Sequence, residues 1–323
     1  MQSLSYNISP PIKQSLQKIE TMRRQIVLSP LPPSIEIRLR WEATISRIQN
    51  SLYLSNNRMR KQDVVNLLNK QNSLPVIVKD KKKFASNELD VLHYKQALDY
   101  IYQNWLLSDK PVTSQTVVKL HSLASEGRLK SSESSMREML NFLQANPENP
   151  IIPASIAYSE LVRMKPFTKG NARTARLLAL LLLYKYGYDF RGLLVLEKYW
   201  RENMLAFNQQ YEKVAAGGSI TLWLEFIMKG LIASLEEIIR SLDLLSFQTD
   251  MRSSYFELND RQKAILATLD QPGSAITNKK VQSVFGVSQI TASRDLARLA
   301  SVGLLFAHGK GRSIYYTQLG GST

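Results

Sequence analysis

At 323 residues the chain is longer than one hydrophobic core usually serves, so we expect two or three domains. It contains no cysteine, which excludes disulfides and thiolate metal sites and fits a reducing compartment. The formal net charge of +15 indicates either an acidic partner, such as nucleic acid, acidic lipid or an acidic protein, or a solvated surface rich in lysine.

The distribution of apolar residues predicts a cytoplasmic protein. Residues 1–11 lack the basic stretch followed by an apolar one that a signal peptide has. The longest apolar run, Leu177 to Leu183, is far shorter than the roughly 18–20 residues that span a bilayer. We therefore expect no membrane partner.

Three segments follow one another along the chain. Residues 1–83 contain a proline-rich break and then a helical stretch over residues 35–51. Residues 84–245 carry apolar side chains at helical spacing, which predicts a series of amphipathic helices. Residues 255–319 change to short helices followed by an alternating, strand-like end. The predicted fold class is mainly α, with a helical domain and a small α/β domain.

A charged motif precedes the long apolar run: residues 165–176 have the sequence KPFTKGNARTAR. A Pro-Phe turn leads to a Gly-Asn-Ala loop at the start of a buried helix, and the amides of a helix N-terminus bind anions. Arg173 and Arg176 add positive charge on the first turns. The pattern predicts a phosphate-binding loop. The alternative is a loop-to-helix junction with two surface arginines.

This motif resembles that of the Fic family, His-Pro-Phe-x-Asp/Glu-Gly-Asn-Gly-Arg-x-x-Arg. The segment Leu120 to Leu123 and the helix with Glu88 and Tyr94 also resemble family helices, and the resemblance covers residues 35–231. Most Fic proteins transfer AMP from ATP to a protein hydroxyl. In them the motif His is the general base and the acidic residue holds Mg²⁺. The resemblance implies a helical Fic-like core at residues 84–245.

Both the motif His and the acidic residue are replaced in this sequence. Lys165 stands at the position of the His, Lys169 at that of the acidic residue, and Ala172 replaces the second Gly. A lysine amine in water is almost wholly protonated at pH 7, so it is a poor base unless neighbouring cations favour its neutral form. The resemblance therefore assigns Lys165 to an altered catalytic position and leaves no metal ligand for Mg²⁺.

The rest of the motif can still hold a phosphate. We expect ATP or another nucleotide as the ligand, bound by Lys169, Gly170, Asn171, Ala172, Arg173 and Arg176. A catalytically impaired, nucleotide-binding Fic-like domain is the interpretation that follows. The alternative is an active protein adenylyltransferase or another phosphotransferase, with Lys165 or a different group as the base.

Two further features of the family are altered. The segment Glu42 to Ser51 resembles the inhibitory helix Ser/Thr-x-x-x-Glu-Gly/Asn, with Ile45 at the Ser/Thr position, Gln49 at the Glu position and Asn50 retained. A neutral Gln cannot pair with an arginine as a carboxylate does. The target-docking hairpin of the family would fall at residues 126–135, which are too few for a full hairpin. Loss of the inhibitory Glu together with the base, the metal ligand and the docking hairpin is the pattern expected of a pseudoenzyme.

Capping residues and glycines indicate three helices in the last segment. We expect Asp260 to cap the first, Thr277 or Asn278 the second and Ser288 the third. A turn at residues 270–273 ends the first helix, and a glycine stops the second before the third begins.

The third helix, Ser288 to Val302, has two different faces. Ala292, Leu296 and Leu299 form an inward stripe at spacings of four and three. The outward face carries side chains that suit contact with the major groove of DNA. These are Gln289, Ile290, Ser293, Arg294 and Arg298.

A β-wing is predicted after this helix. Leu304 to Phe306 is strand-like, a glycine turn presents Lys310 and Arg312, and residues 313–317 form a second strand. Cations at such a tip can contact a phosphate or the minor groove. The run of residues 287–296 with the following Gly-Leu-Leu resembles winged helix-turn-helix regulators of the DeoR-like kind.

This second resemblance implies double-stranded DNA as a partner, bound by a homodimer on paired half-sites. A winged helix used for protein contact is the alternative. Together the segments predict a nucleotide-binding Fic-like domain coupled to a DNA-binding module at residues 255–319, and hence a transcriptional regulator. A protein-interaction module without either activity is the third interpretation.

Overall fold

The computed structural model describes residues 7–70, 84–130, 133–145, 149–216, 220–248, 258–269, 274–301, 304–309 and 314–317. The chain divides into two compact units. The larger comprises Met1–Leu28, Ala43–Leu67 and Pro75–Arg240, and the smaller comprises Ser29–Glu42, Leu68–Leu74 and Ser241–Thr323.

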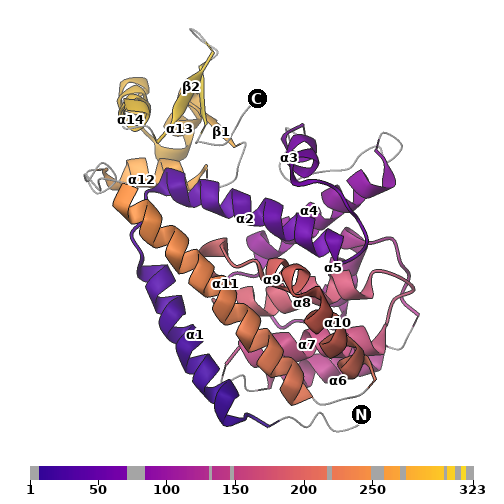
Figure 1. Cartoon of the computed structure of the whole chain (residues 1–323). Coiled ribbons are helices and arrows are strands. Elements are labelled where there is room, and N and C mark those ends of the chain that lie inside the picture. The colour runs from indigo at the N-terminus through magenta and orange to yellow at the C-terminus, as the bar shows by residue number, and fades with distance from the viewer. Residues whose placement is uncertain are drawn as a thin grey trace. The chain divides into compact units, whose positions relative to one another are not determined.

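Helices account for nearly all of the described part of the larger unit, as the sequence predicted (Figure 1). In chain order the elements are α1 (Pro10–Leu28), α2 (Pro33–Tyr53), α3 (Lys61–Asn69), α4 (Ser86–Asn104), α5 (Ser114–Ala124), α6 (Glu133–Gln144), α7 (Ile151–Met164), α8 (Asn171–Lys185), the 3₁₀ turn η2 (Phe190–Gly192), α9 (Leu196–Glu202), α10 (Met204–Ala215) and α11 (Ile220–Gln248). Helices α2, α3 and α11 each contain residues of both units.

Helix α8 lies in the core of this unit because it is apolar on nearly every side. Leu177, Leu178, Leu181 and Leu182 are fully buried, and α8 packs against α4, α5 and α7. A helix that is apolar all round has no face for solvent and must be covered by other helices. The prediction of a buried helix directly after the Gly-Asn-Ala loop is therefore confirmed.

The described C-terminal part of the smaller unit has three helices and a three-stranded sheet. Its elements are α12 (Asp260–Ala267), β1 (Ala275–Thr277), α13 (Asn278–Phe285), α14 (Gln289–Ser301), β2 (Phe306–His308) and β3 (Tyr315–Thr317). The strand order is β1-β3-β2, and β3 pairs antiparallel with both neighbours. The mainly helical class with a small α/β part is thus confirmed.

Local signals placed most of these elements correctly. Thr277 caps α13 by accepting a hydrogen bond from the amide of Lys280, and Gly286 ends α13 in a left-handed conformation with φ of 62°. Such a φ favours glycine because a Cβ would be strained there. Ser288 accepts a hydrogen bond from the Thr291 amide at the start of α14, as predicted.

Two expectations for this unit are wrong. Asn259, not Asp260, caps α12, because its side chain accepts from the Gln262 amide while Asp260 already lies in the first turn. Leu304 and Leu305 are not in a strand. They are buried in the core, and β2 begins only at Phe306. Strand β1 was not expected at all.

Several predicted features lie outside the described residues. They are the turn at 270–273, Val302 and the wing tip with Lys310 and Arg312. Among the described residues, none of the helices has both the length and the apolar character that a membrane span requires.

Candidate functional site

The motif loop connects α7 to α8, and its shape follows from two left-handed residues. Helix α7 ends at Lys165, which has φ of 45° and precedes a proline that cannot continue a helix. Gly170, with φ of 79°, is the N-cap residue of α8. The side chain of Asn171, the first residue of α8, closes the loop: its Nδ2 donates to the Phe167 carbonyl (2.8 Å) and its Oδ1 accepts from the Phe167 amide (2.9 Å).

His121 supports the loop from α5. Its ring stacks on Phe167 with centroids 3.8 Å apart, and its Nε2 lies 3.0 Å from the carbonyl oxygen of Lys169. A carbonyl only accepts, so Nε2 carries the proton and donates it. Burial lowers the pKa of His121, and the charges of Arg173 and Lys169 act in the same direction against the effect of that hydrogen bond. His121 is therefore neutral at pH 7 and supports the motif loop structurally.

The segment that follows α5 runs along the motif loop. The amide of Lys130 donates to the Pro166 carbonyl (2.9 Å), and that of Thr168 donates to the Arg128 carbonyl (2.8 Å). The approach is close because residue 127 is glycine: a Cβ there would lie 2.6 Å from the Lys169 carbonyl oxygen. These residues fix the loop from one side.

A pocket of about 420 Å³ opens at the N-terminus of α8, a size within the range of small-molecule sites. Gly170 offers no side-chain cap, so the first amides of α8 are left without one. The lining residues come from the turn after α2, from α4, from the segment after α5 and from the motif. They are Leu54, Ser55, Ser86, Leu89, Asp90, His93, Ser125, Glu126, Lys169, Gly170, Asn171, Ala172 and Arg173.

Arg173 is held mainly by its own chain. Its Nη1 donates to the Asp90 carboxylate at 2.6 Å and to the Ala124 carbonyl at 2.8 Å. The guanidinium is nearly buried, while its Nε has no hydrogen-bond partner among the described residues. Arg173 thus lines the pocket with most of its charge compensated by Asp90, and its Nε is buried.

Lys169 also lies at this pocket, with its ammonium 3.8 Å from the Glu126 carboxylate and mostly exposed to solvent. A Mg²⁺ ion does not fit this arrangement. The position that would provide its carboxylate ligand carries an ammonium, and the carboxylates of Asp90 and Glu126 are already paired with cations.

Lys165 and Arg176 do not line the pocket, although Arg176 was expected to bind the phosphate together with Lys169 and Arg173. Lys165 is exposed at the end of α7. Arg176 is buried and turns toward the end of α2, where its Nε donates to Ser51 Oγ (2.6 Å) and its Nη2 to the Ser51 carbonyl (2.8 Å) and Ser55 Oγ (2.7 Å). Arg176 is therefore held by the chain's own polar groups and does not lie at the pocket where it was expected.

The segment resembling an inhibitory helix lies in α2, and none of its three singled-out residues lines the pocket. Ile45 is buried. Asn50 is buried too: its Nδ2 donates to the Ser46 carbonyl (2.7 Å), and its Oδ1 accepts from Arg201 (3.2 Å). Gln49 is half-buried. It is Ser51, at the end of this segment, that contacts the motif.

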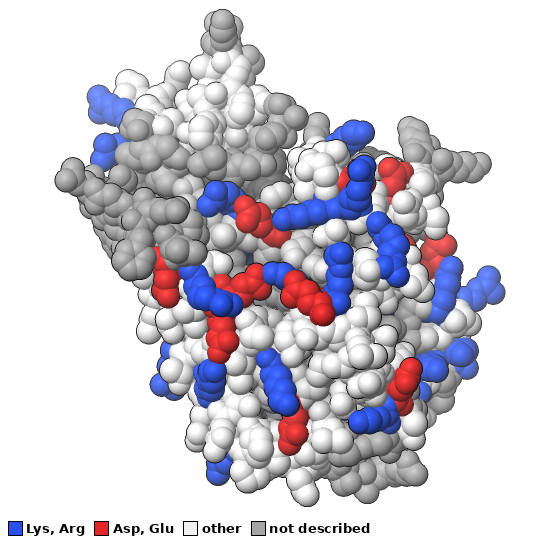
Figure 2. All heavy atoms as spheres, viewed as in Figure 1, with Lys and Arg blue, Asp and Glu red and all other residues white. Residues whose placement is uncertain are grey.

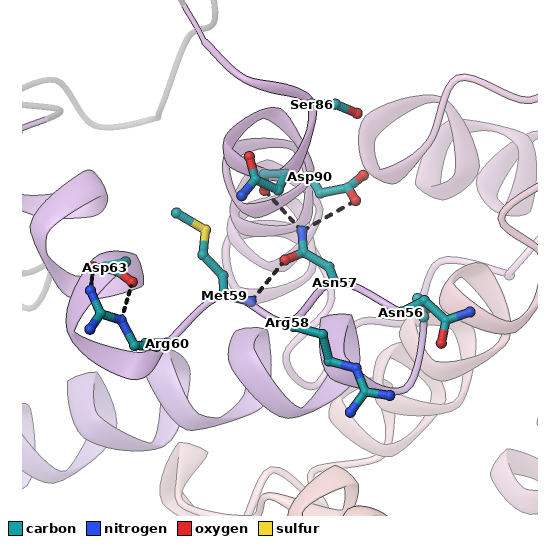
Figure 3. A pocket seen from close by; sticks show the side chains of 10 residues that line it. Asn56, Asn57, Arg58, Met59, Arg60, Asp63, Ser86 and Asp90 are labelled. Carbon is teal, nitrogen blue, oxygen red and sulfur yellow. Dashed lines mark hydrogen bonds and ion pairs between the residues drawn. The ribbon is translucent and has the colours of Figure 1, made fainter.

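A second pocket of about 680 Å³ adjoins the first and shares Ser55, Ser86 and Asp90 with it. Figure 3 shows that Asn57 points to α4, where its Nδ2 donates to the Asn87 carbonyl (2.9 Å) and lies 3.4 Å from Asp90. Asp90 therefore stands at the border of both pockets.

Three polar residues of α4 that line the motif pocket were missed by the sequence analysis. Ser86, Asp90 and His93 recur at spacings of four and three, whereas Val91 and Leu92 between them are fully buried. A polar stripe on one face of an otherwise apolar helix is the signal that could have identified them.

The other predicted site is the outward face of α14. Ala292, Leu296 and Leu299 are buried as predicted, whereas Gln289, Ile290, Ser293, Arg294 and Arg298 are all exposed. The structure therefore brings these five side chains to one exposed side of the helix.

Asp295 anchors α14 from the inner side, a role that the sequence analysis missed. Its carboxylate accepts from Arg261 Nε (2.6 Å) and Gln262 Nε2 (2.9 Å). Burial would raise the pKa of Asp295, but these hydrogen bonds and the charge of Arg261 outweigh it and hold the pKa below its usual value. Arg261 thus fixes α14 to α12.

Figure 2 shows two kinds of charged surface. On the face in view, Lys and Arg of the larger unit lie among Asp and Glu, whereas the blue side chains in the region of α14 have no red neighbour among the coloured residues.

Comparison with known proteins supports the fold of the larger unit. Residues 87–183 match the model of the Fic/DOC family, so this part of the chain is a Fic domain. None of the curated proteins compared with the chain is similar to it.

Three solved structures are similar to this chain at identities that show the fold alone. A Fic family protein from Desulfovibrio desulfuricans G20 has 17% identity and a TM-score of 0.60, with 98% of each chain covered. Fic-1 from C. elegans has 19% identity and a TM-score of 0.54 over 71% of this chain and 70% of that one. A Fic domain containing signaling protein from Bacteroides thetaiotaomicron VPI-5482 has 17% identity and a TM-score of 0.51 over 71% of this chain and 97% of that one.

Proposed function

We propose that this protein is a DNA-binding transcriptional regulator whose Fic domain binds a nucleotide or another phosphate ligand without transferring it. The observation that carries the proposal is the outward face of α14, where polar, cationic and apolar side chains are exposed on the side opposite the buried stripe. A helix with this distribution fits the major groove, which offers hydrogen-bonding base edges and thymine methyl groups.

The surrounding elements support a winged helix-turn-helix. Helices α13 and α14 are joined by a three-residue turn that begins at Gly286, so α14 is the second helix of the pair. The antiparallel strands β2 and β3 then form a hairpin whose tip lies outside the described residues. In this class the second helix enters the major groove and the hairpin can contact the backbone or the minor groove.

Loss of transfer is supported by the chemistry of the motif. The motif has neither a histidine nor a carboxylate at the two positions that serve catalysis in the family. His121 donates its Nε2 proton to the Lys169 carbonyl and is engaged in holding the loop. What the pocket retains is the start of α8, whose first amides suit an anion, beside the ammonium of Lys169.

An active adenylyltransferase is the second candidate, favoured by the match of residues 87–183 to the Fic/DOC family. Incubation of the whole protein with labelled ATP and Mg²⁺ separates the two. The regulator is expected to retain ATP reversibly in equilibrium dialysis and to leave no label on itself or on added proteins. Covalent labelling would overturn the proposed loss of transfer.

DNA binding is tested by titration of the whole protein against genomic duplex fragments at about 50 and 200 mM salt, between which phosphate contacts lose much of their affinity. We expect binding at the lower salt and a steep loss at the higher. The double variant Arg294→Ala/Arg298→Ala removes two charges from α14. Its matched control, Arg137→Ala/Lys213→Ala, removes two exposed charges from the larger unit.

The proposal requires the α14 variant to bind more weakly than the control at both salts. Absence of binding at low salt, or an equal loss in both double variants, would assign this surface to protein recognition instead.

A further inference from the structure

Ile290 is the most exposed large apolar side chain in the described part of residues 258–317. It is 65% exposed, compared with 48% for Val284 and 43% for Phe306. It follows Gln289 in the first turn of α14, on the side away from the buried stripe. A β-branched residue in a helix has lower propensity than most alternatives, and here it gains no burial in return.

Exposure alone does not indicate a site, because single apolar residues are common on protein surfaces. The neighbours of Ile290 are the second observation. Gln289 precedes it, and Ser293 and Arg294 lie one turn further along the same exposed face. An apolar side chain among donors and acceptors at the start of such a helix matches the mixture of groups along the floor of the major groove.

The first turn of α14 is also held in place. Asn278, the first residue of α13, donates from its Nδ2 to the Gln289 carbonyl (3.2 Å) and to Ser293 Oγ (2.8 Å). Ser288 caps the same turn through the Thr291 amide. Ile290 is thus presented on a turn braced from both ends, so little conformational freedom remains to be lost when a partner covers it.

Resting on the proposed DNA-binding function, we propose that Ile290 contacts the 5-methyl group of a thymine in the major groove and makes affinity depend on that one base. The thymine methyl is the apolar group that base edges present there. Arg294 lies four residues on, a rise of about 6 Å along the helix, which corresponds to about two base-pair steps. The preferred duplex therefore carries this thymine within about two base pairs of the base contacted by Arg294.

The experiment uses the whole protein to enrich duplexes from a pool of random sequences. In the enriched duplex each thymine is replaced in turn by deoxyuridine, which lacks only the methyl group and keeps the same pairing. The wild-type protein is expected to lose about fourfold in affinity at one position, the effect of burying one methyl-sized group. Ile290→Ala should bind the thymine duplex more weakly and should no longer distinguish thymine from uracil at that position.

The matched control is Val284→Ala, which shortens an exposed aliphatic side chain on α13 and should distinguish the two duplexes as the wild type does. If a duplex is enriched but the protein distinguishes none of its thymines from uracil, the proposed role of Ile290 is wrong and the proposed DNA binding still stands. The role of Ile290 is also wrong if the Ile290→Ala variant still distinguishes the thymine duplex from the uracil duplex. If no duplex is enriched, the proposed DNA binding fails and this inference with it.

Discussion

In the pocket of the Fic domain, positive side chains lie against groups of the same chain, whereas on the outer face of α14 Arg294 extends into solvent. Arg173 pairs with Asp90 at 2.6 Å, and the Lys169 ammonium is 3.8 Å from Glu126. Arg294 is exposed and no ion pair joins it to the described residues. Cations of the pocket are therefore paired with carboxylates of the same chain, whereas Arg294 on α14 is available to a partner.

The difference shows why a cationic motif is not by itself an anion site. An internal carboxylate cancels most of the field that a ligand would experience from Arg173, so a phosphate at the pocket must rely on the backbone amides at the start of α8. No described carboxylate pairs with Arg294 on α14, so a polyanion there would experience most of the charge of this side chain. Four predictions test this contrast, from the largest expected effect to the smallest.

Asp90→Ala should cause the largest loss of stability. It would leave the nearly buried guanidinium of Arg173 without a carboxylate, and breaking such a pair costs about 3 kcal/mol or more. Urea unfolding followed by the fluorescence of the buried Trp200 and Trp223 measures the change. Asp63→Ala, which removes the partner of the exposed Arg60, is the control and should unfold at the same urea concentration as the wild type. Equal transitions in the two variants would show that the Asp90 pair is not a structural clamp.

Arg294→Ala should cost about 1–3 kcal/mol in binding to the preferred duplex if the side chain contacts a base edge. Lys310→Ala and Arg312→Ala should instead weaken binding to all sequences and lower the salt slope by about one unit each, as expected for phosphate contacts. Titrations with specific and unrelated duplexes measure both effects. A uniform loss in the Arg294 variant would move this residue from base contact to backbone contact.

The anchoring of α14 should weaken in acid. Because the pKa of Asp295 is depressed in the folded protein, its contribution to stability is present above the ordinary value of 3.8 and is lost as the pH falls through that value and below it. Hydrogen exchange of the α14 amides, compared between wild type and Asp295→Asn at each pH, should differ at pH 6 and converge toward pH 3. A constant difference across this range would exclude the carboxylate as its source.

Lys165→His should produce the smallest change, with no detectable transfer of label from ATP. The new imidazole would lie at an exposed position outside the pocket, and Lys169 would still occupy the place of the acidic residue. Lys165→His/Lys169→Glu is the comparison that restores both groups. Strong labelling by the single variant would show that Lys169 does not block the chemistry.

The sequence by itself determined features that depend on neighbours along the chain. The stripe of Ala292, Leu296 and Leu299 is buried because its spacing follows the helical period. Thr277 and Gly286 set the two ends of α13 through caps that involve only residues close in the sequence. The helix after the motif loop was predictable for the same reason, since a continuous apolar run needs cover on every side.

The partners of the buried charged side chains were decided by the tertiary structure alone. Arg173 meets Asp90 from 83 residues away, and Arg176 meets Ser51 from 125 residues away. Neither spacing follows any helical or strand period. Likewise Leu304 and Leu305 enter the core instead of a strand because they lie over the stripe of α14, where their amides bond to the Leu299 carbonyl. Periodicity and capping are local interactions, whereas the partner of a buried cation depends on which distant helices pack together.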